Sequence, residues 1–216
     1  MKYIIFIALF LTVSLFADDN LKKMSVKEKK KRFYSLVIPV VDKVYEQRYK
    51  LYEDVSEELN SSKKSVQIEE LKQYYKVETD QELLMSLKPQ PKSMAIAQAA
   101  MESAWGTSRF FNLGNNLFGM WSISSKENRI AANVKRDNNT TVWVKKYDSL
   151  EESVRGYYIT LSKGKQYKKL RELNYNTDDV YEVIQGLDRY SERKEAYVDE
   201  IGSIIRYNKL TKYDRK

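Results

Sequence analysis

The chain has 216 residues, with 38 Lys and Arg against 30 Asp and Glu, a formal net charge of +8. It contains neither Cys nor His, which excludes disulfides, thiolate or imidazole metal sites, and every mechanism that needs a cysteine nucleophile or an imidazole base. Only 7 Gly and 3 Pro are present, well below their usual shares of about 7% and 5%. We therefore expect mostly helices, and neither a β-sandwich nor a disordered chain.

The N-terminal segment, residues 1–17, has the pattern of a secretory signal peptide. Lys2 is followed by an apolar run over residues 3–16, and Ala17 precedes an acidic pair. The apolar run is shorter than the roughly 20 residues that a membrane-spanning helix needs, although a retained membrane anchor is the alternative. We predict cleavage near Ala17, a periplasmic or secreted protein, and no stable membrane span after cleavage.

The excess of positive charge favours anionic partners. Because a secreted protein rarely meets nucleic acid, we expect membrane surfaces or anionic wall polymers as partners, and no nucleic acid. The basic run over residues 27–32 is interpreted as the solvated start of a helix and not as a binding patch.

An N-terminal helical extension is predicted over residues 18–90. Its first part, residues 18–30, is polar and is expected to be loose. From about Arg32 to Leu59, apolar residues recur at intervals of three and four, which predicts a helix. Pro39 lies inside this pattern and is expected to kink or restart the helix.

A second helix is predicted from about Val66 to Met85, after a polar turn at residues 60–64. A linker with two prolines follows at residues 88–92. We place the domain boundary in this linker, so that residues 91–216 form the functional domain.

An unusually apolar helix is predicted next, over Ser93–Trp105, with Ser93 as its N-cap and Gly106 as its stop. Ala, Met and Ile occupy nearly every face, as in helices that are buried all round. Gln98 and Glu102 interrupt this pattern, and since they are four residues apart they lie on one face. We expect Gln98 to hydrogen-bond this helix to a neighbour.

The remaining elements are a loop, a hairpin and further helices. Residues 107–127 lack a clear period and are predicted to be a loop, and residues 128–147 are predicted to be a β-hairpin with a polar turn at 136–139. Three helices follow, and they begin at Ser149, at Thr177 or Asp178, and at Ser191. Ser149 is expected to form a capping box with Glu152. The predicted fold class is mainly α (α+β).

Glu102 is the most informative residue for chemistry. Burial and the negative end of the helix dipole both disfavour its ionised form, so we expect its pKa to be raised. A carboxylic acid that keeps its proton near neutral pH is suited to protonating a glycosidic oxygen. The alternative interpretation is a structural Glu paired with a Lys or Arg.

Two motifs surround this residue: AIAQAAMESAWGTSRF at residues 95–110 and GNNLFGMW at residues 114–121. Together they resemble the peptidoglycan N-acetylglucosaminidases of glycoside hydrolase family 73, and most of all their Bax-type branch. The resemblance continues over most of the chain after the signal peptide, in residues 32–34, 39–42, 147–149, 154–157, 190–191 and 197–200.

This resemblance implies a lysozyme-like helical domain with a small β-lobe, which cleaves the β-1,4 bond after N-acetylglucosamine in peptidoglycan. It implies that Glu102 is the general acid and that Tyr190, across the cleft, helps to stabilise charge at the reacting sugar. It also implies that Asn116, Phe118 and Trp121 bind substrate. We interpret the Trp of the ESAWG motif as a residue that packs the helix end.

Many members of the family carry a second acidic residue in the β-lobe. Glu127 is our candidate for this catalytic carboxylate, and Asp137 is the other acid that the lobe offers. If neither reaches the cleft, the N-acetyl group of the substrate acts as the nucleophile, while Glu102 serves as acid and then as base.

Two alternative functions remain. One is a lytic transglycosylase on the same fold, which would leave an anhydro product, and the other is a non-catalytic protein that binds or assembles the wall. We expect no cofactor and no metal site, because glycoside hydrolysis by carboxylates needs none. We expect a monomer that acts on the glycan strands of peptidoglycan.

Overall fold

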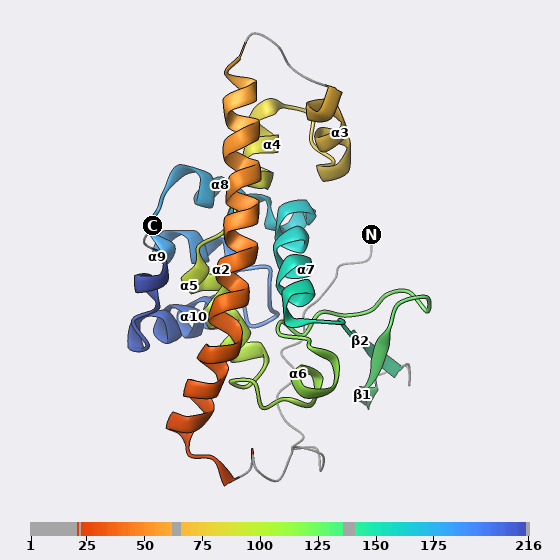
Figure 1. Ribbon diagram of the computed structural model, residues 1–216, viewed down its shortest axis with the longest axis vertical. Coiled ribbons are helices and arrows are strands. Elements are labelled where there is room, and N and C mark those ends of the chain that lie inside the picture. Colours follow the sequence, from red (N-terminus) through yellow and green to blue (C-terminus); the bar gives the residue numbers. More distant parts are fainter. Residues whose placement is uncertain (1–20, 22, 62–65, 136–140, 215–216) are drawn as a thin grey trace. The chain divides into compact units, whose positions relative to one another are not determined.

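The computed structural model describes residue 21 and residues 23–61, 66–135 and 141–214 (Figure 1). The predicted signal peptide, its cleavage site and the predicted hairpin turn lie outside the described residues. The described part is mostly helical with a two-stranded antiparallel sheet, which confirms the mainly α class. No helix in these ranges has the length and apolar character needed to cross a membrane.

The elements follow one another along the chain in the order helices, hairpin, helices. They are α2 (Val26–Leu59), α3 (Val66–Tyr75), α4 (Asp80–Leu87), α5 (Lys92–Glu102), α6 (Arg109–Gly114), β1 (Arg129–Lys135), β2 (Thr141–Lys145), α7 (Leu150–Lys163), η1 (Lys165–Tyr167), α8 (Lys168–Asn176), α9 (Val180–Val183), η2 (Ile184–Leu187), α10 (Glu195–Tyr207) and η3 (Leu210–Tyr213).

The described residues fall into two compact units. The helical unit takes residues 42–95 and 158–214, and the hairpin unit takes residues 21–41 and 96–157. Residues of α2, α5 and α7 belong partly to one unit and partly to the other. The predicted domain boundary after residue 90 stays a prediction.

The first long helix begins earlier than predicted. α2 starts at Val26 because Ser25 and Glu28 form a capping box: the Glu28 N–H donates to Ser25 Oγ at 3.3 Å, and the Ser25 N–H donates to Glu28 Oε2 at 2.7 Å. The Ser25 hydroxyl also donates to Glu28 Oε2 at 2.7 Å, and this bond, followed by the bond from the Ser25 N–H, lowers the pKa of Glu28 from its ordinary value. The expectation of a loose stretch up to residue 30 is therefore wrong from Val26 onward.

Pro39 does not restart this helix, contrary to that part of the expectation. Figure 1 shows α2 as one continuous helix, and Pro39 lies inside it. Val37 and Val41, on either side of Pro39, are fully buried. Their packing outweighs the loss of the one backbone hydrogen bond that a proline removes.

In the helical unit, the single helix expected over residues 66–85 is two helices. α3 ends at Tyr75, Lys76 takes a left-handed φ of 59°, and α4 starts after Thr79. Thr79 and Glu82 form a capping box that starts α4. The two helices share an apolar cluster with the second half of α2, made of Val55, Ile68, Tyr75, Leu83 and Leu87.

The C-terminal part of the helical unit is closely packed around η2. This 3-10 helix contacts α8 and α10, and α8 also contacts α4. Gly186 permits the contact with α8, because a Cβ at this position would lie 2.4 Å from Leu170 Cα. The helix expected to start at Ser191 begins at Glu195.

In the hairpin unit, the predicted β-hairpin is confirmed. β1 and β2 pair antiparallel, with Ile130 opposite Val144 and Ala131 opposite Trp143. The region expected to be a loop contains the short helix α6, whose N-cap Ser108 accepts a hydrogen bond from the Phe111 N–H at 3.2 Å.

Candidate active site

Glu102 is the last residue of α5, three residues before the predicted end of this helix. Residues 96–100, which precede it in the hairpin unit, are each at most 1% exposed, as expected for a helix that is apolar all round. Glu102 itself is half-buried. The buried part of the helix therefore ends at Glu102, whose carboxylate lies where solvent has access to it.

The chain leaves α5 through a left-handed turn, which explains why the helix ends early. Ala104, Trp105 and Gly106 have φ values of 50°, 59° and 73°. Left-handed residues other than glycine are strained, by about 1–2 kcal/mol each. Ser103 supports the turn, because its Oγ donates to the Ala99 carbonyl and accepts a hydrogen bond from the Gly106 N–H at 2.9 Å.

The first half of α2, within the hairpin unit, holds this turn from outside. The Trp105 ring meets the rings of Phe33 and Tyr34 edge-on, with centroids 5.5 Å and 5.8 Å apart. Arg32 donates from Nη1 to the Gly106 carbonyl oxygen at 3.1 Å. Trp105 thus packs the helix end, as its position in the sequence predicts, and α2 compensates the strain next to Glu102.

Gly119 of the NNLFG motif lies directly against the Glu102 carboxylate. A Cβ at residue 119 would lie 3.6 Å from Glu102 Oε2, and Gly119 has a left-handed φ of 62°. The two motifs, close in sequence, therefore also meet in space. Gly119 was not among the predicted site residues, although a glycine that ends a motif is a usual sign of positive φ or of a close approach.

Asn116 holds the loop that contains Gly119. Its amide nitrogen donates to the carbonyl oxygens of Met120 at 3.0 Å and Lys145 at 2.8 Å, and its Oδ1 accepts from the Met120 N–H at 3.0 Å. The side chain is 1% exposed. Its amide thus fixes the loop to β2, and its predicted contact with substrate stays a prediction.

Phe118 connects the same loop to the interior of the unit. It is fully buried and stacks on Tyr157, with ring centroids 4.0 Å apart and an interplanar angle of 12°. The Tyr157 hydroxyl donates to Gln98 Oε1 at 2.6 Å, which confirms the expected hydrogen bond between Gln98 and a neighbouring element. Phe118 therefore ties the loop to α5 one turn before Glu102, while its predicted role in substrate binding is untested.

Trp121 is the one member of the predicted substrate-binding trio that is not buried. Its backbone forms a bridge with Val144 of β2, and its ring packs on the small hairpin core. Binding of substrate by Trp121 stays a prediction.

Glu127 lies in the same unit, in a polar and positively charged setting. Lys145 Nζ is 2.9 Å from Glu127 Oε1, and Ser122 Oγ donates to Glu127 Oε2 at 2.8 Å. Partial burial, the largest single influence, raises the pKa of Glu127, but the hydrogen bonds from Lys145 and Ser122 and the charge of Lys145 outweigh it. The pKa therefore lies below its ordinary value, and Glu127 is ionised at neutral pH.

Tyr190 belongs to the helical unit, whereas the other predicted site residues belong to the hairpin unit. It is 1% exposed and stacks on Tyr197, with ring centroids 5.3 Å apart and an interplanar angle of 17°. Tyr167 lies against it at a tilted angle, with centroids 6.0 Å apart. A place for Tyr190 opposite Glu102 stays a prediction.

The described ranges contain no group of three or more His, Cys, Asp or Glu side chains that could hold a metal ion. The two predicted catalytic carboxylates of the hairpin unit, Glu102 and Glu127, have different surroundings. Sequence reasoning missed two neighbours of these carboxylates, Gly119 and Lys145, because neither contact follows a local period.

The sequence matches the profile of the glucosaminidase family, described as mannosyl-glycoprotein endo-beta-N-acetylglucosaminidase, over residues 81–210. Protein bax of Escherichia coli strain K12 is 33% identical to the chain over 82 residues. This alignment covers 38% of the chain and only 27% of that protein.

Solved structures share the fold. The catalytic domain of the autolysin Auto from Listeria monocytogenes has a TM-score of 0.53 at 20% identity, covering 95% of this chain and 99% of that one. An N-acetylmuramoyl-L-alanine amidase from Staphylococcus aureus has a TM-score of 0.53 at 18% identity, covering 88% of this chain and 44% of that one. Because the family profile covers more than half of the sequence, the chain belongs to the glucosaminidase family, glycoside hydrolase family 73.

Proposed function

We propose that this enzyme hydrolyses the β-1,4 bond after N-acetylglucosamine in peptidoglycan, with Glu102 as the general acid. The observation that carries the proposal is the position of Glu102 at the end of an apolar helix, with its carboxylate against Gly119. Since Gly119 has no side chain, it places only backbone against the carboxylate. A glycosidic oxygen bound there would receive the proton of Glu102 as the bond breaks.

The choice of peptidoglycan as substrate has separate support. The motifs around Glu102 resemble those of peptidoglycan glucosaminidases, and the structural neighbour from Listeria is an autolysin. The excess of basic residues and the predicted signal peptide agree with an enzyme that acts on an anionic wall in the periplasm or outside the cell. Membership of an enzyme family also favours hydrolysis over the non-catalytic alternative.

Glu127 is the proposed second carboxylate. Its lowered pKa keeps it ionised, which suits a base, a nucleophile or a group that stabilises positive charge at the sugar. The alternative route uses the N-acetyl group of the substrate as nucleophile. Tyr190 is proposed to stabilise charge at the reacting sugar in either route.

The assignment of Glu102 is tested with Glu102→Gln, which keeps the shape of the side chain and removes its proton. We expect turnover of purified peptidoglycan sacculi to fall by about 10³-fold or more, with an unchanged helical circular dichroism spectrum. Glu70→Gln is the matched control, because Glu70 is an exposed residue of the helical unit. Turnover retained in Glu102→Gln would contradict the proposal.

Mass spectrometry of the released fragments tests the reaction type. Hydrolysis after N-acetylglucosamine leaves reducing N-acetylglucosamine ends, whereas a lytic transglycosylase leaves anhydro-muramic ends that are lighter by one water molecule.

N-terminal sequencing of the protein recovered from the periplasm or the medium tests the predicted cleavage near Ala17.

A further inference from the structure

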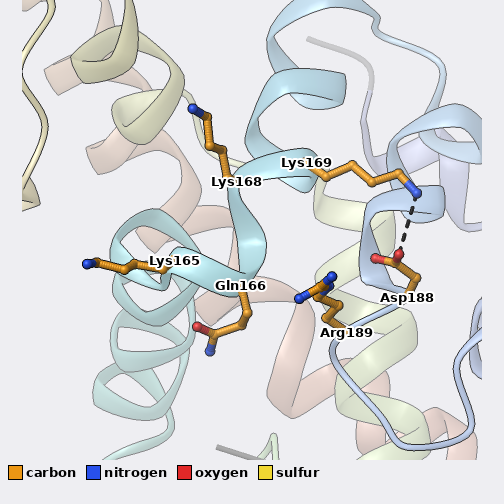
Figure 2. Close-up of a pocket in the computed structure, with 6 residues that line it drawn as sticks. All are labelled: Lys165, Gln166, Lys168, Lys169, Asp188 and Arg189. Carbon is orange, nitrogen blue, oxygen red and sulfur yellow. Dashed lines mark ion pairs between the residues drawn. The ribbon is translucent and has the colours of Figure 1, made fainter. Parts of the chain in front are cut away.

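The helical unit contains a second feature suited to binding, a basic pocket of about 260 Å³ (Figure 2). This volume is smaller than the roughly 300–1,000 Å³ of pockets for drug-sized ligands, so it suits a small chemical group. The pocket is lined by Lys165, Gln166, Lys168, Lys169, Asp188 and Arg189.

The charges of this pocket are not balanced. Its lining residues include four cations and one carboxylate, which leaves a net charge of 4 − 1 = +3. Lys169 Nζ is 3.6 Å from Asp188 Oδ2, and Lys168 has only long contacts, at 3.9 Å to Glu82 and 4.0 Å to Glu172. Lys165 and Arg189 form no ion pair with any other residue that the structure describes. Cations gathered in this way repel one another, and a bound anion would relieve that repulsion.

The walls of the pocket are held by the fold. Gly186 lets η2 approach α8 closely, since a Cβ there would meet the Leu170 backbone, and this contact sets the position of residues 188 and 189. On the other side, buried Arg171 donates from Nη1 to the carbonyl oxygens of Leu161 and Gly164, both at 2.8 Å, which anchors η1 and the start of α8. The backbone beneath the pocket is therefore held by the packed unit, while the four cationic side chains that line it are exposed.

The side chains also suggest how an anion would be held. Figure 2 shows Arg189 and Gln166 in the middle of the group, while Lys165 and Lys168 extend outward at its rim. Lys168 and Lys169 also occupy the first turn of α8, which contains no acidic residue. The positive end of the helix dipole adds there to the positive charge of the lysines, an arrangement that costs free energy without an anion.

We propose that this pocket binds a phosphate group. A carboxylate is planar and is satisfied by one bidentate arginine, whereas a phosphate presents oxygens in several directions and suits one Arg surrounded by Lys residues. If the enzyme acts on the cell wall as proposed, the phosphate belongs either to a soluble phosphodiester polymer or to a lipid headgroup. Such a site would hold the enzyme near an anionic surface independently of its catalytic groups.

The proposal is tested by calorimetric titration of the purified protein with inorganic phosphate, against sodium chloride at the same ionic strength so that screening is constant. We expect saturable binding of phosphate. In the double variant Lys165→Gln, Arg189→Gln we expect the affinity to fall about tenfold or more, since the variant loses two charged hydrogen-bond donors to the anion.

The matched control is the double variant Lys27→Gln, Lys31→Gln, which removes the same charge from exposed positions of the hairpin unit. We expect it to bind phosphate within about twofold of the parent protein, because no pocket residue changes. Absence of saturable binding, or equal weakening in the two double variants, overturns the proposal. Circular dichroism and the unfolding temperature confirm that each variant is folded, and the result does not depend on glycan cleavage.

A second pair of titrations distinguishes the source of the phosphate. One uses soluble poly(glycerol phosphate), and the other uses vesicles of phosphatidylglycerol with vesicles of phosphatidylcholine as reference. Binding of either that weakens in the pocket variant and not in the control variant supports the site and identifies its partner. Binding of both that weakens equally in the two variants contradicts it, since general charge attraction then accounts for the effect.

Discussion

Glu102 and Glu127 belong to the same unit but have opposite surroundings. Glu102 ends an apolar helix and lies against a glycine, whereas Glu127 lies in a polar loop with Lys145 at 2.9 Å and a serine hydroxyl at 2.8 Å. In glycosidases, two carboxylates with different environments take the roles of acid and of charged partner. Two residues of the same type thus differ in their surroundings because of their neighbours, which are the strained turn and Gly119 for Glu102, and Lys145 and Ser122 for Glu127.

The variant with the largest expected effect is Glu127→Gln, which tests whether Glu127 takes part in catalysis. If Glu127 is the second catalytic carboxylate, kcat on peptidoglycan should fall by about 10²-fold or more. The amide still accepts a hydrogen bond from Ser122, so the loop should stay folded. A kcat within about twofold of the parent enzyme would remove Glu127 from the mechanism and favour the substrate-assisted route.

The surroundings of Glu102 are tested next by Arg32→Ala, which removes the hydrogen bond from α2 to the Gly106 carbonyl. Because that bond helps to hold the strained turn after Glu102, we expect kcat to fall by about tenfold with a smaller change in KM. Arg32→Lys should restore part of the loss. Loss of stability with an unchanged kcat would limit Arg32 to a structural role.

Gly119→Ala tests the contact between the two motifs. A side chain at a left-handed φ costs about 1 kcal/mol, and the added methyl group would lie 3.6 Å from Glu102 Oε2. We expect a lower unfolding temperature and a modest fall in kcat. Gly156→Ala is the glycine control; a fall in kcat as large in this control would show that the effect is not specific to residue 119.

The smallest expected effect is a shift in pH dependence in Lys145→Met. Lys145 lowers the pKa of Glu127, and without it the raising effect of burial remains, so the acidic limb of kcat/KM should move to higher pH. The pKa of Glu127 is lower in the folded protein than in the unfolded chain, so the ion pair stabilises the folded protein above the unfolded pKa. This stabilisation is lost as the pH falls through the folded pKa.

The unfolding temperature of the variant should therefore be lower than that of the parent protein at neutral pH. The difference between the two should be smaller in acid. Lys126→Met, which changes an exposed neighbour of Glu127, should change neither measurement. An unmoved acidic limb in Lys145→Met would show that Glu127 does not set the pH dependence.

Local signals predicted much of the fold. The hairpin and the helix α7 follow from alternation, from β-forming residues and from the Ser149 and Glu152 capping box, which need only neighbours in the chain. The capping boxes at Ser25 and Thr79 were present in the sequence in the same form, and reading them would have placed the start of α2 and the break before α4.

The sequence alone determined the helical class, the family motifs and the identity of Glu102 as the informative carboxylate, because these depend on composition, period and local spacing. Only the tertiary structure decided where α5 ends, since contacts from α2, some seventy residues earlier, help to hold the left-handed turn at Ala104 and Trp105. It also decided which groups lie beside each carboxylate. Contacts between distant segments balance strain and charge in ways that no local pattern records.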